Sequence, residues 1–406
     1  MTASSFFKTM VTKSNWLLTV FTISSIRLEI VAMNYICQSM HLPLIFNFGH
    51  TSKRMESVVQ ILKDSSQCPN LNFYDGYCTI DFWNNKQFKV VCNTRGYKIE
   101  DRKQRFGLYS TYHLLHTKEG TIIENTVRAL NQLKKMFKFN MVFLNICTKT
   151  IKVSFFEELF SKITFNPGYK ITMDGVKFDL DVVNYLLNTL KAEDYFVFWN
   201  SDMPSDFKHE NAFKLQGVVY MDGRWVQVED VLKIQGADFV HLHETNFTVA
   251  NVHEIIDRWI NSEVDMFKNF NAQYLFDDFL PNAILDDLIG FEQMCLFGPM
   301  FFTLAKSTSA ARVDTVLAIA IRQSYFILCA WKPTESFPVE YAKGDAYKDA
   351  YKILTILNKK DKLEKEMKQE TDGYERNRLA EEIQELVEKM WDLGGRFENG
   401  KVYVDR

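Results

Sequence analysis

A block of the sequence recurs at an offset of 69 residues. The matching positions are Ile171-Thr172-Met173, Phe178, Val183 and Leu186 in the first copy, and Val240-His241-Leu242, Phe247, Val252 and Ile255 in the second. Each copy alternates apolar and polar residues, continues through a loop that ends at a phenylalanine, and then spaces its apolar residues as an amphipathic helix does. One strand–helix unit cannot bury its own apolar face, so the sequence predicts units that stack side by side.

Further copies of this unit lie between and before the two that match best. Residues 218–232 contain a short apolar strand and an amphipathic run, residues 195–199 read as another strand, and residues 151–163 read as an earlier copy. The mean spacing of about 23 residues is within the range of roughly 20–29 that leucine-rich repeats use. The consensus leucine and asparagine ladder is missing. The predicted fold class is therefore α/β, with an irregular leucine-rich-repeat-like strand–helix stack, and an ordinary non-repeating α/β domain is the alternative.

Composition limits the classes of protein that the chain can belong to. It has 406 residues, of which 47% are apolar, with only 17 glycines and 8 prolines, and this composition excludes a disordered or linker-dominated chain. The net charge of −3 gives no basic excess for nucleic acid, and no apolar run reaches the roughly 20 residues of a membrane span. The seven scattered cysteines without a C-x-x-C motif predict reduced thiols in an intracellular protein of the cytoplasm or nucleus.

The chain has three zones that we expect to form separate parts. Residues 27–65 read as a small helical unit, and residues 70–340 as the α/β domain. Residues 345–395 are highly charged, with apolar residues at helical spacing on both sides of Gly373, and they predict a charged helical hairpin as a tail.

Signatures of catalysis are missing from the sequence. It lacks the G-x-S-x-G, H-E-x-x-H, Walker and G-x-G-x-x-G motifs. His241 and His243 alternate on a strand and could grip a metal, but solvated histidines on the outward face of the strand are the favoured interpretation. The aspartate pairs at 277–278 and 286–287 and the pair His113 and His116, placed on a predicted helix, are interpreted in the same way. We therefore expect no catalytic residue, no metal and no cofactor.

The stretch from Met40 to Val59 resembles the second half of a nematode F-box. It contains the proline turn at Pro43, an apolar stretch and a Ser-Lys-Arg sequence that begins a helix, with Thr51 where the family usually has cysteine. In that family the F-box binds the Skp1 adaptor of a cullin-based ubiquitin ligase. The resemblance places the Skp1-binding surface on Ile36, Met40, Pro43, Leu44, Ile45, Phe46, Phe48, Lys53 and Arg54.

A second stretch resembles the type 2 F-box-associated domain. The matching runs are Trp225-Val226-Gln227-Val228-Glu229-Asp230-Val231-Leu232, Ala237–Leu242 and Ile255–Ile260, the last containing Trp259. The resemblance is clearest over residues 150–290. It implies a substrate-recognition subunit that is not itself an enzyme, with a Skp1-like adaptor, a cullin scaffold and unknown protein substrates as partners. Because the family's opening Leu-Pro has no counterpart near Ile26, a scaffold that has lost its coupling to the ligase is the alternative.

The sequence does not assign the substrate-binding residues. If the strands stack as predicted, their exposed side includes Lys170, Thr172, His241 and His243, while the loop aromatics Trp225 and Phe247 pack between units.

Overall fold

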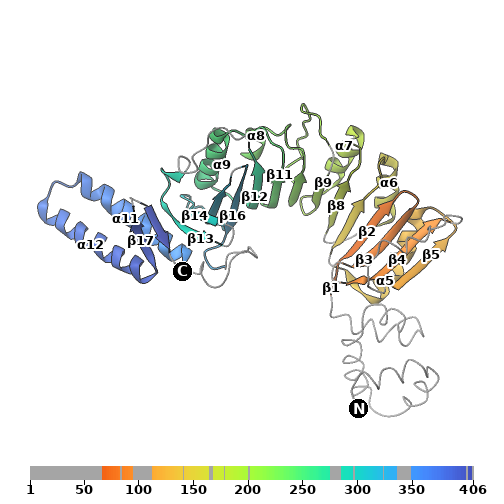
Figure 1. Cartoon of the computed structure of the whole chain (residues 1–406), viewed down its shortest axis with the longest axis horizontal. Helices are drawn as coiled ribbons and strands as arrows, with labels where there is room; N and C mark the ends of the chain where they lie inside the picture. Colours follow the sequence, from red (N-terminus) through yellow and green to blue (C-terminus); the bar gives the residue numbers. More distant parts are fainter. Residues whose placement is uncertain are drawn as a thin grey trace, which may run out of the picture. The chain divides into compact units, whose positions relative to one another are not determined.

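The structure is a computed structural model of the chain, and it has a mixed α/β fold (Figure 1). It describes residues 66–82, 85–94, 112–139, 141–163, 168–177, 179–199, 202–274, 285–295, 298–322, 324–335, 349–398 and 401–404. The chain divides into two compact units, residues 1–69 with 79–140, and residues 70–78 with 141–406. The predicted F-box-like unit at 27–65 lies outside the described residues.

The first unit is built around one helix and the strands beside it. Its described elements are β1 (Ser66–Gln67), most of β3 (Tyr77–Phe82), β4 (Asn85–Thr94), β5 (Tyr112–Lys118), α5 (Ile122–Met136) and β6 (Lys138–Phe139). β4 pairs with β5, and β1 with β6, in parallel. Thr121 and Glu124 form a capping box that begins α5, and the Asn125 amide donates to the Asn93 carbonyl of β4 at 2.9 Å. The prediction of a helix for His113 and His116 is wrong, because both lie in β5.

The second unit contains a run of parallel strands in chain order. These are β2 (Pro69–Tyr74), β7 (Val142–Ile146), β8 (Tyr169–Asp174), β9 (Tyr195–Trp199), β10 (Gly217–Tyr220), β11 (Ala237–Leu242) and β12 (Phe267–Gln273), each hydrogen-bonded to the next. The helices between them are α6 (Val153–Lys162), α7 (Leu180–Thr189), α8 (Val228–Val231) and α9 (Val249–Asn261). Strands that are parallel neighbours need such crossover connections.

The register of these strands explains the repeat at an offset of 69 residues. Ile171 is level with Phe196, Phe196 with Val218, and Val218 with Val240. The two matching residues Ile171 and Val240 therefore lie in one row of the sheet, three strands apart. The repeat in the sequence is a repeat in space.

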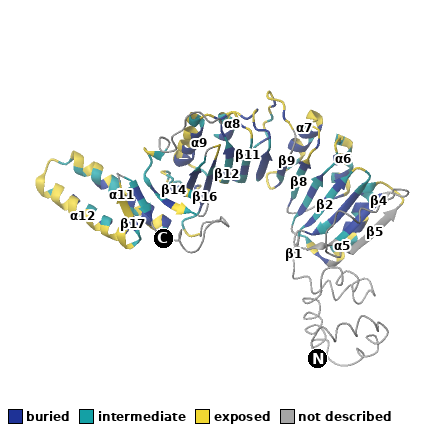
Figure 2. Cartoon of the chain, in the orientation of Figure 1, coloured by how far each residue is buried: buried dark blue, intermediate teal, exposed yellow. Residues whose placement is uncertain are grey.

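One face of this sheet forms the core with the helices. Apolar residues on the inner side of α7 and α9 are buried, and the strand residues that alternate with the more exposed ones are buried as well (Figure 2). Asp179 caps the N-terminus of α7, and Thr248 caps that of α9 through hydrogen bonds to backbone N–H groups. Trp259 is among the largest fully buried side chains and lies at the end of α9.

Beyond β12 the strand pairing becomes antiparallel. β12 pairs with β16 (Tyr325–Trp331), and the order continues through β15 (Val316–Ile321), β14 (Gly298–Leu304) and β13 (Gly290–Cys295). β18 (Lys401–Val404) lies parallel to β13, and β17 (Gly395–Glu398) pairs with β18. The last two strands were not expected from the sequence.

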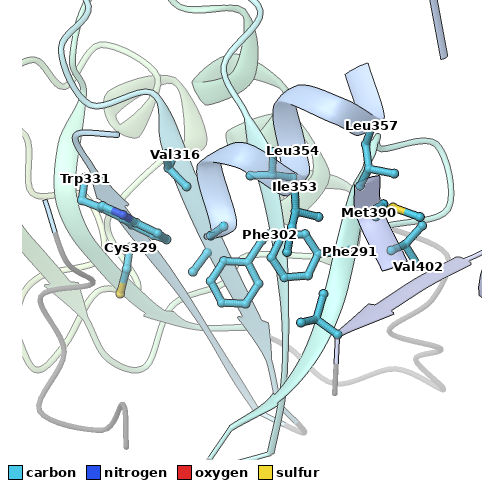
Figure 3. Close-up of a cluster of buried hydrophobic side chains, with 13 residues drawn as sticks. Phe291, Phe302, Val316, Cys329, Trp331, Ile353, Leu354, Leu357, Met390 and Val402 are labelled. Carbon is cyan, nitrogen blue, oxygen red and sulfur yellow. The ribbon is translucent and has the colours of Figure 1, made fainter. Parts of the chain in front are cut away.

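The charged C-terminal zone contains two helices, α11 (Ala350–Gln369) and α12 (Gly373–Asp392). Lys359 of α11 forms an ion pair with Glu382 of α12 at 2.6 Å. Figure 3 shows α11 above the strands, where Ile353 and Leu354 join one apolar cluster with Phe291, Phe302, Val316, Cys329, Trp331, Met390 and Val402. The apolar side of α11 therefore belongs to the core of the second unit. The predicted boundary between residues 340 and 345 lies outside the described residues.

Candidate functional site

The Skp1-binding residues predicted from the F-box resemblance, Ile36 to Arg54, all lie outside the described residues. The candidate site that the structure does describe is the second face of the parallel sheet, which is turned away from α6, α7, α8 and α9 (Figure 1). We call it the open face and define it by two rows of residues. The first row is Phe143, Lys170, Tyr195, Gly217, Phe239 and Asn269, and the second is Asn145, Thr172, Val197, Val219, His241 and Asn271.

The residues that the sequence singled out for this side come together there. Lys170 and Thr172 lie on β8, and His241 lies level with Thr172, with only Val197 and Val219 between them. These polar side chains alternate with the buried residues of the helix-covered face, as the alternation of a strand requires. They are half-buried.

Two aromatic rings stack on each other in the middle of the first row. The rings of Tyr195 and Phe239 stack with centroids 5.4 Å apart and an interplanar angle of 20°, although the strand β10 lies between their own strands. Gly217 is the residue of β10 beneath them. A Cβ atom at Gly217 would lie 2.6 Å from Phe239 Cε1 and closer still to Tyr195 Cδ1. The two rings can therefore stack in this way only because residue 217 is a glycine and has no side chain.

Lys170 lies in the same row with its ammonium group among aromatic rings. Its Nζ atom is 5.6 Å from the centroid of the Phe143 ring and 5.7 Å from that of the Phe239 ring, distances at which a cation is attracted to an aromatic face. Burial lowers the pKa of Lys170 below the usual value for lysine. None of the described carboxylates forms an ion pair with it.

Asp238 precedes Phe239 on β11 and is held by three hydrogen-bond donors. It accepts hydrogen bonds from the Tyr195 hydroxyl at 2.8 Å, the Gln216 amide at 2.7 Å and the Lys268 ammonium at 2.9 Å. Burial by itself would raise the pKa of Asp238, but the bonds from Lys268, Tyr195 and Gln216 outweigh it and leave the pKa below its usual range. The same environment raises the pKa of Tyr195, first through burial and then through Asp238. Asp238 is therefore ionised and fixes the tyrosine ring.

His241 and His243 extend the open face along β11 and just past its end. Burial is the largest cause that lowers the pKa of each, and the nearby His243 lowers that of His241 further. Both imidazoles are therefore neutral at pH 7, and the His243 ring lies 6.4 Å from the Trp199 ring, centroid to centroid. Over the described part of the chain, no three histidine, cysteine or acidic side chains are placed to hold a metal ion.

The motif that carries the F-box-associated resemblance has a structural role. Trp225 is 3% exposed, and its ring contacts Phe207, Phe213 and Tyr220, while its indole N–H donates to the Asp222 carbonyl at 3.0 Å. Phe247 is buried as well. The burial of both side chains agrees with the prediction that these loop aromatics pack inside the protein and are not exposed binding groups. Phe178, the counterpart of Phe247, lies outside the described residues.

Sequence reasoning missed the aromatic part of the open face. Phe143, Tyr195 and Phe239 come from three strands and span almost a hundred residues of sequence, so no local pattern connects them. The one available signal was Gly217, a glycine at the start of an otherwise apolar strand, which often marks a close approach.

Comparison with protein-family models, with curated proteins and with solved structures finds no match to this chain. In the segments that the structure describes, no helix combines the length and the apolar character needed to cross a membrane.

Proposed function

We propose that the chain is the substrate-recognition subunit of a Skp1–cullin–F-box ubiquitin ligase and binds target proteins through the open face. The observation that supports the receptor function is the open face itself, a broad sheet surface whose two rows hold aromatic and polar side chains and a single charged residue, Lys170. Aromatic residues are enriched and charged residues depleted at the centres of protein interfaces. The ligase part rests on the resemblance of residues 40–59 and 225–260 to the F-box and its associated domain.

The strand order supports an irregular leucine-rich-repeat-like stack as the architecture of the receptor. Successive strands from β7 to β12 are parallel neighbours in chain order, so each strand–helix unit contacts chiefly the units before and after it. Such a stack presents its strands as a continuous binding surface. In this proposal α11 and α12 form a helical hairpin whose core is shared with the final strands of the stack.

Skp1 docking in this proposal falls on the apolar segment around Pro43. Leu44, Ile45, Phe46 and Phe48 are concentrated in five residues, and a helical unit of about 40 residues has too little core to be stable alone. Burial of these side chains on a partner helix would remove them from water. Enzymatic activity is not part of the proposal.

The test is co-purification of the full-length chain with Skp1, comparing the wild type with the double variant Ile45→Asp, Phe46→Asp. We expect the wild type to retain Skp1 and the double variant to lose it, since two buried carboxylates are incompatible with an apolar interface. The matched control is Leu180→Asp, Val313→Asp, which makes the same change in charge at apolar side chains that are 50% and 45% exposed. Equal recovery of Skp1 with both double variants would contradict the docking surface.

A scaffold without ligase coupling is the second candidate, and the missing Leu-Pro at the start of the F-box favours it. Such a protein would hold its partners through the same open face but would not recover Skp1. The turnover of bound partners separates the two functions. A ligase subunit predicts longer partner half-lives when cullin activity is blocked, whereas a scaffold predicts no change.

A further inference from the structure

Of the two charged residues at the open face, Asp238 has an oppositely charged partner and Lys170 has none among the described residues. Asp238 has Lys268 as its partner at 2.9 Å together with two neutral donors. The ammonium of Lys170 lies near the rings of Phe143 and Phe239 and is close enough to His241 to lower the pKa of that imidazole, and it forms no ion pair with any residue that the structure describes. The two histidines on the face are neutral at pH 7 because burial lowers their pKa values. At this pH Lys170 is therefore the positive charge in the two rows that lacks a counter-charge.

The position of Lys170 suits it to receive a carboxylate. An ammonium group has three N–H donors, and contacts with the faces of Phe143 and Phe239 attract its charge but offer no lone pair. A half-buried cation gains most from a partner that brings both a negative charge and hydrogen-bond acceptors. The aromatic rings beside it would hold the apolar part of the same ligand and exclude water from the ion pair.

We propose that Lys170, flanked by the rings of Phe143 and Phe239, binds the carboxylate of an aspartate or glutamate side chain in a client protein. This inference rests on the proposed receptor function and names the chemistry that the receptor recognises. A nucleic acid is a poor occupant, because phosphate backbones are bound by several cations and this row offers one. An acidic side chain flanked by apolar residues matches both the charge and the aromatic surface.

The experiment uses the full-length chain and a phage-displayed library of random dodecapeptides. Peptides selected on the wild type are synthesised, labelled and titrated by fluorescence anisotropy, each beside a version with its Asp and Glu changed to Asn and Gln. The protein variants are Lys170→Met, which keeps the apolar stem, and Lys170→Arg, which keeps the charge. Lys233→Met is the control, because Lys233 is an exposed lysine outside the open face.

We expect the selected peptides to share a carboxylate beside apolar residues. Removing either that carboxylate or the Lys170 charge should weaken binding about tenfold or more, and removing both should weaken it little further, because the two act as one pair. Lys170→Arg and Lys233→Met should bind within about threefold of the wild type. Selection without enrichment, selected peptides without a carboxylate, or unchanged affinity of Lys170→Met would each overturn the proposal.

The outcome is separable from that of the proposed ligase function. Retained Skp1 co-purification together with any of the overturning results rejects the acidic client and leaves the ligase subunit. Loss of Skp1 co-purification with carboxylate-dependent peptide binding intact rejects the ligase coupling and leaves the binding site.

Discussion

Replacement of Gly217 by alanine tests the construction of the open face directly. The added methyl group would lie 2.6 Å from the Phe239 ring and closer to that of Tyr195, so the rings must separate by about 1 Å to reach ordinary contact. The Tyr195 ring cannot swing away without losing its hydroxyl bond to Asp238. Overpacking of this kind costs about 1–3 kcal/mol, and the lost stacking adds about 0.5–1.5 kcal/mol. The gain from restricting the unfolded chain is about 0.4–1 kcal/mol, which leaves a net loss of about 2 kcal/mol.

The measurement is urea denaturation followed by tryptophan fluorescence. Gly373→Ala is the control, because nothing lies within 4 Å of the Cβ position there and the residue begins α12. We expect this control to match or slightly exceed the wild type in stability. Phe239→Leu in the Gly217→Ala background should recover part of the loss, because the smaller side chain leaves space for the methyl group. A Gly217→Ala variant as stable as the control, or a loss that Phe239→Leu does not reduce, would refute this account of the stacked pair.

Three further variants test other parts of the second unit. Arg312→Met should destabilise the fold by about 2–4 kcal/mol in urea, because the buried guanidinium donates to the Ser262 carbonyl at 2.8 Å; a loss below about 0.5 kcal/mol would contradict this role. The pKa of His241 is below 6.5 in the folded chain, so the unfolded chain binds this proton more readily and the stability of the fold falls as the pH drops below about 6.5. His241→Gln should therefore lose less stability than the wild type between pH 7 and pH 5. An unchanged dependence of stability on pH would refute this. Leu354→Ala should cost about 2–5 kcal/mol and the control Tyr351→Ala, at a 40% exposed position, far less, whereas equal losses would show that α11 is not held by this core.

The repeat and the C-terminal helices could be predicted from the sequence because both leave a local periodicity. Ile171 and Val240 match at a fixed offset, and the register places them in one row of the sheet. Leu379, Leu386 and Met390 mark the inner side of α12 by their spacing, and all three are buried. Local patterns of this kind survive as long as each element packs on its own apolar side.

The parts that could not be predicted depend on contacts between distant residues. β18 joins the sheet through the pairing of Val404 with Gln293, more than a hundred residues earlier, and four residues of strand carry no recognisable pattern. His113 and His116 are three residues apart, a spacing that suits a helix, but their segment pairs along its whole length with β4 and forms a strand. In both segments the pairing with a distant strand, and not the local sequence, determines the secondary structure.

The open face combines a structural requirement with a chemical one. Gly217 has no side chain, so Tyr195 and Phe239 can stack across β10, and the Phe239 ring that this arrangement fixes is one of the two that flank the Lys170 ammonium. Asp238 holds Tyr195 from the other side, and its own charge is matched by Lys268. Asp238 therefore positions the tyrosine and has Lys268 as its counter-charge, whereas Lys170 has no counter-charge and can pair with that of a ligand. It follows that Gly217→Ala should lower both the stability of the sheet and the affinity for a carboxylate, whereas Lys170→Met should lower the affinity without lowering the stability, because burial already disfavours the charge of Lys170.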